Sequence, residues 1–320
     1  RRINLSEPVK LNRLQALRFT ASASIPSVSD PETGEILSQM RSSPDLTEFE
    51  GGILKPVSEF HATNDRGIFD HGVGSARVDV YSGKSFNIWQ PRTGEIFASA
   101  DPKVAGAELR QRIERQIKLK SSAFFGLSII GDLGGKMPFE RTRIALRGVT
   151  NSTNSRTVIA SLIPSNVFLT NMAPYFISKP GNEKAEAFAL AFLSSIPFDW
   201  YARKFVDAAM NFHLLSSFPL PEMTDSPRSR RIVELSGQLA AVDETYADWA
   251  TCVAVELGTL SDEKSRAEAI AELDGLVALA YGLSKANLKH IYKTFHRGWN
   301  DQIRLESALA FMDDWSDSNG

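Results

Sequence analysis

The chain has 320 residues, of which 42% are hydrophobic and 23% are charged, and its formal net charge is −2. This length and composition suit a folded protein of two or three domains and exclude a disordered chain. No apolar run reaches the roughly 18 residues that a membrane-spanning helix needs, so we expect no contact with a membrane.

Cysteine and histidine usage narrows the possible chemistry. Cys252 is the only cysteine, which excludes an internal disulfide and a cysteine-based zinc site and fits a reducing, cytoplasmic setting. The five histidines are scattered without the spacing of a metal site. The sequence begins Arg-Arg-Ile-Asn without a methionine, so we expect a fragment of a longer polypeptide or a chain whose start is missing.

The charge is unevenly distributed along the chain. Between residues 107 and 147 there are nine Lys or Arg against four Asp or Glu, whereas residues 260–320 hold seven basic and ten acidic side chains. A net charge of −2 is low for a protein coated in nucleic acid. A basic middle and an acidic end nevertheless suit a protein that binds an anionic ligand on one face.

The first hundred residues are predicted to be mostly irregular. Residues 1–50 are polar and rich in Ser, Pro and Asp, and we expect loops that link short elements. A Pro-x-Thr-Gly-Glu-Ile pattern occurs at 31–36 and again at 91–96 and predicts two hairpin tips. Between them, the alternation over Ala76–Tyr81 predicts a strand.

Residues 101–120 are predicted to form an amphipathic helix. Asp101 is a suitable N-cap, and a proline follows it at the first helical position. Leu109, Ile113 and Ile117 recur every fourth residue and form one apolar stripe, while arginines and lysines occupy the other faces. Two interpretations stay open: a helix that contacts phosphates, or an ordinary solvated face.

The glycine-rich segment 131–138 is interpreted as a loop. It is not a phosphate-binding P-loop, because Lys136 is followed by methionine and no glycine lies five residues before Gly135. The runs that follow predict strands at 142–148, 157–163, 166–170 and 174–178.

Helices are predicted at 182–195 and 197–210, and a final strand at 211–223, whose two prolines exclude a helix interior. After Ser226 the sequence becomes entirely helical in pattern, with helices at 228–258, 262–282, 284–295 and 300–315. The predicted fold class is therefore mixed α+β. The predicted domains are a β-containing domain at 1–225, with an irregular N-terminal part, and a helical domain at 226–320.

The stretch Arg141–Ser178 is the best candidate for ligand binding. Its predicted strands flank an Asn/Ser/Thr turn, with Arg147 before the turn and Arg156 after it. Arginine can pair bidentately with guanine, and asparagine with adenine. The alternative is that Asn151 and Asn154 cap a hairpin and Arg156 forms a structural ion pair.

Catalytic motifs are not evident. The sequence has no Gly-x-Ser-x-Gly, His-Glu-x-x-His or Gly-x-Gly-x-x-Gly pattern. NMAPYF at 171–176 is superficially similar to the Asn-Pro-Pro-Tyr/Phe motif of amino-methyltransferases, but Met172 and Ala173 separate Asn171 from Pro174. We therefore predict no catalytic residue and no metal site in this chain, and its membership of an enzyme stays open.

Several segments together resemble the specificity half of large adenine-N6 DNA methyltransferases, including the type II restriction-modification proteins that fuse methylation with target recognition. These segments are EFEGGILKPVSEFHATND (48–65), TRIALRGVTNSTNSRTVIASLIP (142–164), NMAPYF (171–176), AFALAFLSSIPFDWYARKFVDAAMNFHLLSSFPLPEM (187–223) and LVALAYGLSKANLKHIYKTF (276–295). Each match is loose, and the resemblance rests on their order over about 270 residues.

The resemblance implies that residues 1–225 form a target recognition domain. It implies double-stranded DNA as a partner, and a separate upstream methyltransferase domain or subunit that binds S-adenosylmethionine, whereas this chain itself holds no cofactor. That catalytic domain would flip and methylate the base, as part of bacterial defence against phage, while this chain holds the register on the duplex. The predicted DNA-binding residues are Arg110, Arg112, Arg115, Lys118, Lys120, Lys136, Arg141, Arg143, Arg147, Asn151, Asn154 and Arg156.

A second hypothesis is a protein-interaction module of a defence complex that does not touch DNA. In that case the helical C-terminal third docks a partner subunit. The acidic end and three tryptophans among apolar helical residues, Trp249, Trp299 and Trp315, favour it.

Overall fold

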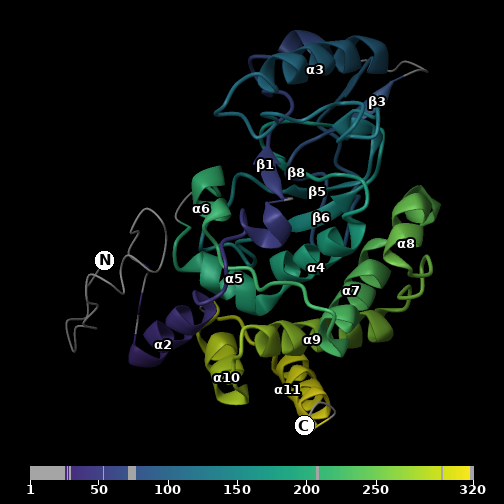
Figure 1. Ribbon diagram of the computed structural model, residues 1–320. Coiled ribbons are helices and arrows are strands. Elements are labelled where there is room, and N and C mark those ends of the chain that lie inside the picture. Colours follow the sequence, from purple (N-terminus) through teal and green to yellow (C-terminus); the bar gives the residue numbers. More distant parts are fainter. Residues whose placement is uncertain are drawn as a thin grey trace.

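The computed structural model describes residues 26, 28, 30–52, 54–70, 77–206, 209–296 and 298–317. These residues form helices and two four-stranded sheets, which confirms the predicted α+β class. Figure 1 shows the sheets and helix α3 in the upper part of the molecule and most other helices below them. No helix in the described ranges is both long and apolar enough to cross a membrane.

The two sheets are built largely from the predicted strands. The first sheet has the order β1-β8-β5-β6 and is antiparallel throughout, with β1 (Lys55–Val57), β8 (Tyr175–Ile177), β5 (Arg143–Leu146) and β6 (Ala160–Ile163). The second has the order β2-β4-β3-β7, with β2 (Phe69–Asp70), β4 (Ala98–Ala100), β3 (Val78–Tyr81) and β7 (Phe168–Leu169). Its β3–β7 pair is parallel.

All predicted strands up to residue 178 are confirmed with shorter bounds. The strand predicted from Ala76 is described from Val78 onward, because Ala76 lies outside the described residues. Every residue of β5 and β6 is buried, which accounts for their nearly continuous apolar sequence. The 91–96 pattern lies in the connection 82–97 between antiparallel β3 and β4, which is longer than a hairpin tip.

Helix α2 (Pro31–Met40) contradicts the predicted loop and hairpin tip at 31–36. Asp30 caps it by accepting a hydrogen bond from the Thr33 amide, 2.8 Å away, and a proline occupies the first position. Ile36, Leu37 and Met40 are buried on one face. The cap and the spacing of the apolar residues together favour the start of a helix and outweigh the turn preference of Thr-Gly. Residues 1–25, which were also predicted as loops, lie outside the described residues.

Helix α3 (Pro102–Gln116) begins at the predicted cap, since the Asp101 carboxylate accepts from the amides of Lys103 and Val104. It ends four residues before the predicted bound. Leu109 and Ile113 are buried as the stripe requires. The basic faces of α3 therefore point away from the core.

The segment after α4 (Glu183–Ser194) and α5 (Ile196–Arg203) corrects two predictions. The second helix ends at Arg203, well before 210; residues 207–208 lie outside the described part. The strand predicted at 211–223 is wrong, because Asn211 caps a short helix, α6 (Phe212–Ser216). Pro219 makes only an isolated bridge with Asp45, as expected for a residue that cannot donate to a ladder.

The C-terminal third is helical as predicted. Its helices are α7 (Pro227–Ala240), α8 (Ala247–Val253), α9 (Glu263–Ala280), α10 (Lys285–Thr294) and α11 (Gln302–Asp317). The single helix predicted at 228–258 is wrong, because Asp243 caps a new turn and separates α7 from α8. Short 3-10 helices complete the fold at Phe49–Gly51 (η1), Arg66–Ile68 (η2), Pro138–Glu140 (η3) and Glu244–Tyr246 (η4).

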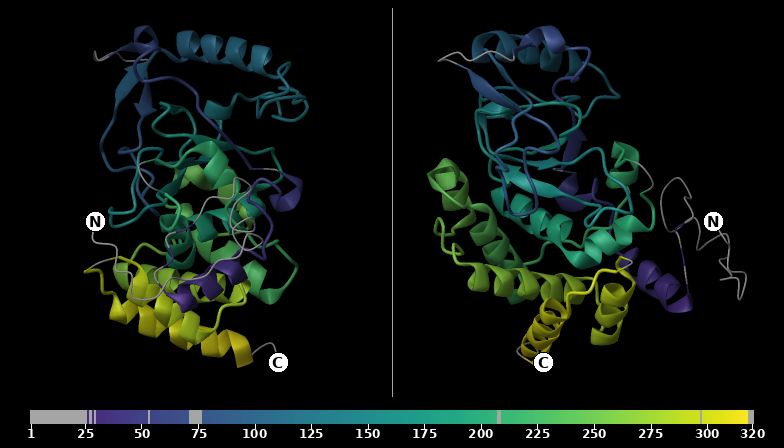
Figure 2. Two further views of the ribbon diagram at one scale, coloured as in Figure 1. Left: turned by 90° about the vertical axis from the view of Figure 1, so that its left-hand side faces the viewer. Right: turned by 180° about the vertical axis from the view of Figure 1, so that it is seen from behind.

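Two apolar clusters hold these elements together. One extends from Ile36 to Met312 and includes α4, α7 and α9; the other lies between the sheets and α3 and extends from Val57 to Ile177. The domain boundary near 225 stays a prediction, but helices from both sides of it share the first cluster. Figure 2 shows α2 beside the C-terminal helices, where the His290 ring lies 2.8 Å from the Glu32 carboxylate.

Glu186 is a buried carboxyl group within this packing. It lies on α4, and its Oε2 accepts a hydrogen bond from Nε1 of Trp249 on α8, 2.8 Å away. Burial raises the pKa of Glu186 to about 7, partly offset by the hydrogen bonds from Trp249 and Ser178. The folded protein therefore holds this proton more tightly than the unfolded chain does.

We predict that Glu186→Gln flattens the pH dependence of stability. A raised carboxyl pKa stabilises the fold fully below pH 4.5, and that contribution is lost as the pH rises from 4.5 to 7, at a cost of roughly 3 kcal/mol. The variant should therefore be more stable than the parent at pH 8 and similar to it near pH 4.5. Urea unfolding at both pH values measures this, and an equal effect at both would contradict it.

Candidate nucleic-acid interface

The structure divides the twelve predicted DNA-binding residues into three groups. One group is bonded within the protein: Arg112, Arg141, Arg143, Arg147 and Arg156. A second group is exposed on α3 and on the connection that follows it: Arg110, Arg115, Lys118, Lys120 and Lys136. The third group is the pair Asn151 and Asn154 in the turn at 150–156. Binding of DNA by any of the twelve residues stays a prediction.

The turn is organised by Asn151. Its Oδ1 accepts hydrogen bonds from the amides of Thr153 and Asn154, at 2.9 and 3.0 Å, and from the Thr153 hydroxyl at 2.6 Å. This is an Asx turn, in which the side chain replaces a backbone acceptor. The capping role considered for Asn151 is therefore present, and its side-chain NH₂ group is not used by these bonds.

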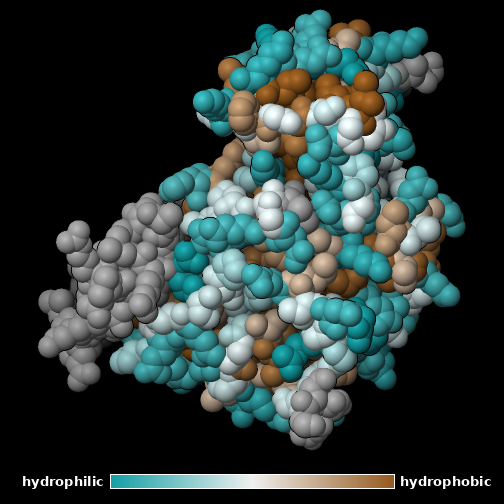
Figure 3. All heavy atoms as spheres, viewed as in Figure 1, coloured by the Kyte–Doolittle hydropathy of each residue, from teal (hydrophilic) through white to brown (hydrophobic). Residues whose placement is uncertain are grey.

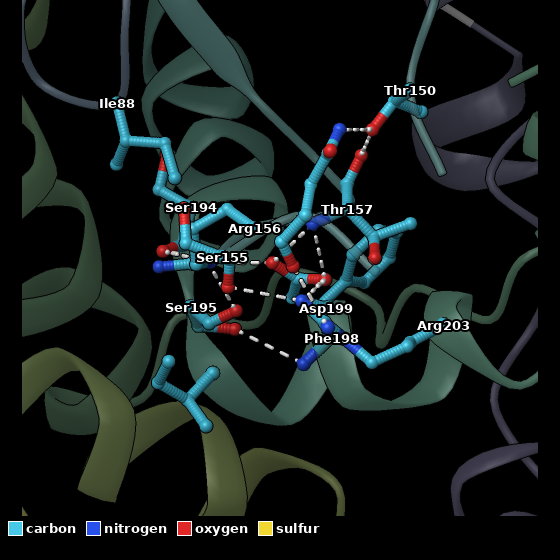
Figure 4. A network of polar contacts seen from close by, with 12 residues as sticks. Ile88, Thr150, Ser155, Arg156, Thr157, Ser194, Ser195, Phe198, Asp199 and Arg203 are labelled. Carbon is cyan, nitrogen blue, oxygen red and sulfur yellow. Dashed lines mark hydrogen bonds and ion pairs between the residues drawn. The ribbon is translucent and has the colours of Figure 1, made fainter. Parts of the chain in front are cut away.

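Arg156 is fixed beneath the turn by Asp199 of α5 (Figure 4). Its Nε donates to Asp199 Oδ2, and its Nη2 donates to the carbonyls of Ser194 and Ser195 at 2.7 and 2.9 Å. The Asp199 side chain is fully buried and also accepts from the Thr157 amide at 3.0 Å. The structural ion pair considered for Arg156 is therefore present.

Arg203 and His296 hold the turn in ways that sequence reasoning missed. Arg203 Nη1 donates to the carbonyls of residues 152 and 154, at 2.9 and 3.0 Å, and its Nη2 donates to that of residue 155 at 3.0 Å. His296 Nε2 lies 2.9 Å from the carbonyl oxygen of residue 153. Four consecutive carbonyls thus face inward, while the side chains of Thr153 and Ser155 are exposed.

The environment of Arg203 is mostly buried. Its guanidinium carbon lies 4.4 Å from the centre of the Phe295 ring, and Asp199 is 3.8 Å from Nη2. Burial lowers the pKa of Arg203, and the charge of Asp199 raises it. The position of Arg203 four residues after Asp199 was the one sequence signal that could have linked them.

The arginines of β5 and its ends support the framework. Arg143 is buried, donates to Glu59 at 2.8 Å and to the Val167 carbonyl at 2.9 Å, and lies over the Tyr175 ring. Burial raises the pKa of Glu59, although Arg143 lowers it. Arg147 donates to the carbonyls of Gly83 and Phe86, at the start of the β3–β4 connection, and Arg141 lies 3.2 Å from Glu183.

On α3 the cations differ in availability. Arg112 forms a bidentate pair with Asp65, at 2.7 and 2.8 Å, and a third bond to Glu108. These bonds raise the pKa of Arg112, and its hydrogen bond is the main cause of the lowered pKa of Asp65. By contrast, among the described residues no carboxylate lies within 4 Å of Arg110, Lys118, Lys120 or Lys136. Their charges face solvent.

The NMAPYF segment has a structural role. Asn171 Oδ1 accepts from the Ala62 amide at 3.0 Å, and Tyr175 is buried beneath Arg143. An aromatic ring that packs a flipped base must be accessible to that base, whereas the Tyr175 ring is buried.

No group of three or more His, Cys, Asp or Glu in the described part of the chain could hold a metal ion.

The tryptophans that favoured partner docking pack within the helical part. Trp249 is buried and bonded to Glu186, and Trp299 packs on the rings of Tyr292 and Phe295, with centroids 5.2 and 4.7 Å away. Trp315 Nε1 donates to Glu272 at 3.1 Å. Docking by this region stays a prediction, and Trp299 and Trp315 are only partly buried.

We predict that Asp199→Ala destabilises the protein by about 3–5 kcal/mol, because it leaves the buried Arg203 and the half-buried Arg156 without their carboxylate. The matched control is Asp313→Ala, which breaks an exposed pair with Lys285 and should cost less than about 1 kcal/mol. Chemical denaturation of both variants measures the difference. Equal losses would show that the buried network does not stabilise the turn.

Comparisons with known proteins give a distant structural likeness. No family model and no curated protein match the chain. A structure of the type IIL restriction-modification enzyme MmeI in complex with DNA is similar to it with a TM-score of 0.36 and 13% sequence identity. The match covers 86% of this chain and 37% of that one, so the chain spans well under half of the length of that enzyme.

Proposed function

We propose that the chain is a sequence-specific DNA recognition module of an adenine-N6 DNA methyltransferase or restriction-modification protein. It positions the duplex, and a separate upstream domain or subunit that binds S-adenosylmethionine flips and methylates the base. One observation carries the proposal. Of the exposed cations on α3 and on the connection 117–137, only Arg115 lies within 4 Å of a described carboxylate, that of Glu108 at 3.9 Å, while the neighbouring Arg112 forms two close ion pairs.

Exposed lysine and arginine side chains suit phosphate contacts. Such contacts neutralise the DNA backbone, release counterions and fix the register of the protein without reading sequence. In this proposal Arg110, Arg115, Lys118, Lys120 and Lys136 make them. The other predicted arginines have a structural role, since they already donate hydrogen bonds to groups of the protein: Arg112, Arg141, Arg143, Arg147 and Arg156.

Base reading is assigned to the turn at 150–156. A base edge is recognised only when the reading group is held in a fixed position. The turn meets this condition, because the Asn151 side chain accepts hydrogen bonds from its backbone amides, and Arg203 and His296 contact its carbonyl oxygens. Asn151 and Asn154, with the exposed side chains of Thr153 and Ser155, are the groups that would meet bases.

We predict that changing Arg110, Arg115 and Lys118 together to Glu weakens duplex binding roughly 100-fold at moderate salt. A plot of the logarithm of the binding constant against the logarithm of the salt concentration has a negative slope. The loss of three phosphate contacts should also reduce the magnitude of this slope by about three. Fluorescence anisotropy with a labelled duplex of random sequence, read over a series of salt concentrations, measures both quantities.

The matched control changes three exposed lysines of the C-terminal helices, Lys264, Lys289 and Lys293, to Glu. It alters the net charge equally, so a similar loss of binding would show that α3 is not special. If the parent protein binds no duplex under any salt condition, the proposed function is wrong, and docking of a partner by the helical third becomes the better hypothesis.

A further inference from the structure

A groove lies beside the exposed cations of α3 and is not used by the network at the turn. Its walls are the carboxyl end of α3 with residues 119–123, the strand β1, and helix α6, and its volume is about 680 Å³. We call it the α6 groove. In Figure 1, α3 lies at the top of the molecule with β1 and α6 below it, and Figure 3 shows apolar side chains directly below α3 on this face.

The chemistry of the α6 groove is selective. None of its described lining residues is acidic, although the chain has 38 Asp and Glu. Lys55 and His213 supply nitrogen donors, and Ser121 and Ser122 are among several hydroxyl groups in the walls. Lysine and hydroxyl side chains are typical phosphate contacts. Lys118 and Lys120 flank the lining residue Leu119 and add positive charge at the rim.

Two partly exposed apolar side chains belong to the groove lining. Leu119 on the α3 side is 53% exposed, and Phe212 at the start of α6 is 37% exposed. Hydrophobic side chains without a partner in the fold stabilise a complex when a ligand covers them. In a site for a sugar–phosphate chain, they would pack against deoxyribose and base edges.

The groove also leads toward the turn that is assigned to base reading. The Met210 amide donates to the Gly148 carbonyl at 3.1 Å, and Val149 and Ala209 form a β-bridge. The residues just before α6 therefore pair with those just before the turn. A strand that followed the groove from α3 past α6 would reach the turn.

A peptide strand is the competing occupant, because β1 is the edge of the first sheet. Pro56 is the central residue of β1, and it has no amide hydrogen to donate to an added strand. Its presence disfavours pairing at this edge. The absence of carboxylates from the lining and the positive rim favour a polyanion instead.

Resting on the proposed function, we propose that the α6 groove binds the sugar–phosphate backbone of one DNA strand. Lys55 and the wall hydroxyls contact phosphates, and Phe212 and Leu119 pack against the sugars and base edges. The groove thereby joins the phosphate contacts of α3 to the turn that reads bases.

Two substitutions separate these roles in the full chain. For a labelled random-sequence duplex, Lys55→Gln should reduce the magnitude of the negative slope of log K against log salt by about one. Phe212→Ala should weaken binding about fivefold at every salt concentration and leave the slope unchanged. Because Phe212 is the first residue of α6, a change there also affects that helix, so His213→Ala is a second groove variant, and it should also weaken binding.

The controls are Lys264→Gln on α9 and Ile303→Ala on α11, both exposed and far from the groove lining. Thermal unfolding confirms that each variant is folded. If the parent binds DNA and the α3 triple variant weakens it, but all groove variants bind like the parent, the groove proposal is overturned while the proposed function stands. A parent that binds no duplex overturns both.

Discussion

The candidate site depends on the ion pairs that the buried carboxylate of Asp199 forms with Arg156 and Arg203. This carboxylate lies at the start of α5, inside the larger apolar cluster, and it meets Arg156, the Thr157 amide and Arg203 from the turn and from its own helix. A buried ion pair adds little net stability, because desolvation offsets its attraction. Its effect here is positional, since it fixes an exposed loop to a helix that cannot move without disrupting the core.

The distribution of charge explains why net charge is a weak guide to this protein. Arg143 with Glu59, Arg156 with Asp199, and Arg304 with Asp274 cancel one another inside the molecule. The local surface is then determined by the exposed charged side chains, which between Arg110 and Lys136 are mostly basic. A chain of net charge −2 can therefore present a face that attracts a polyanion.

Local patterns predicted much of the fold and little of the site. Alternation placed β5, β6 and β8, and the Asp101 cap placed α3, because these signals lie within a few residues of one another. Helices α2 and α6 were missed, since turn residues and prolines competed with short caps. Residue type could not separate Arg112 from Arg110: the carboxylate of Asp65 that engages Arg112 lies 47 positions away in the sequence.

Under the proposed function, the exposed cations and the internally bonded turn have different tasks in the recognition of DNA. A phosphate contact is an attraction between charges, and a flexible lysine in solvent can make it over a range of positions. A base contact requires a defined donor and acceptor geometry, which only a fixed loop provides. The exposed cations lie on and after α3, whereas the asparagines lie on a turn whose carbonyls are bonded from within. The first sheet spans the distance between them, because β1 borders the α6 groove and β5 leads into the turn. Under the proposed function, a change in the buried Asp199 network would therefore alter the selectivity for a DNA sequence before it altered the attraction of α3 for a duplex.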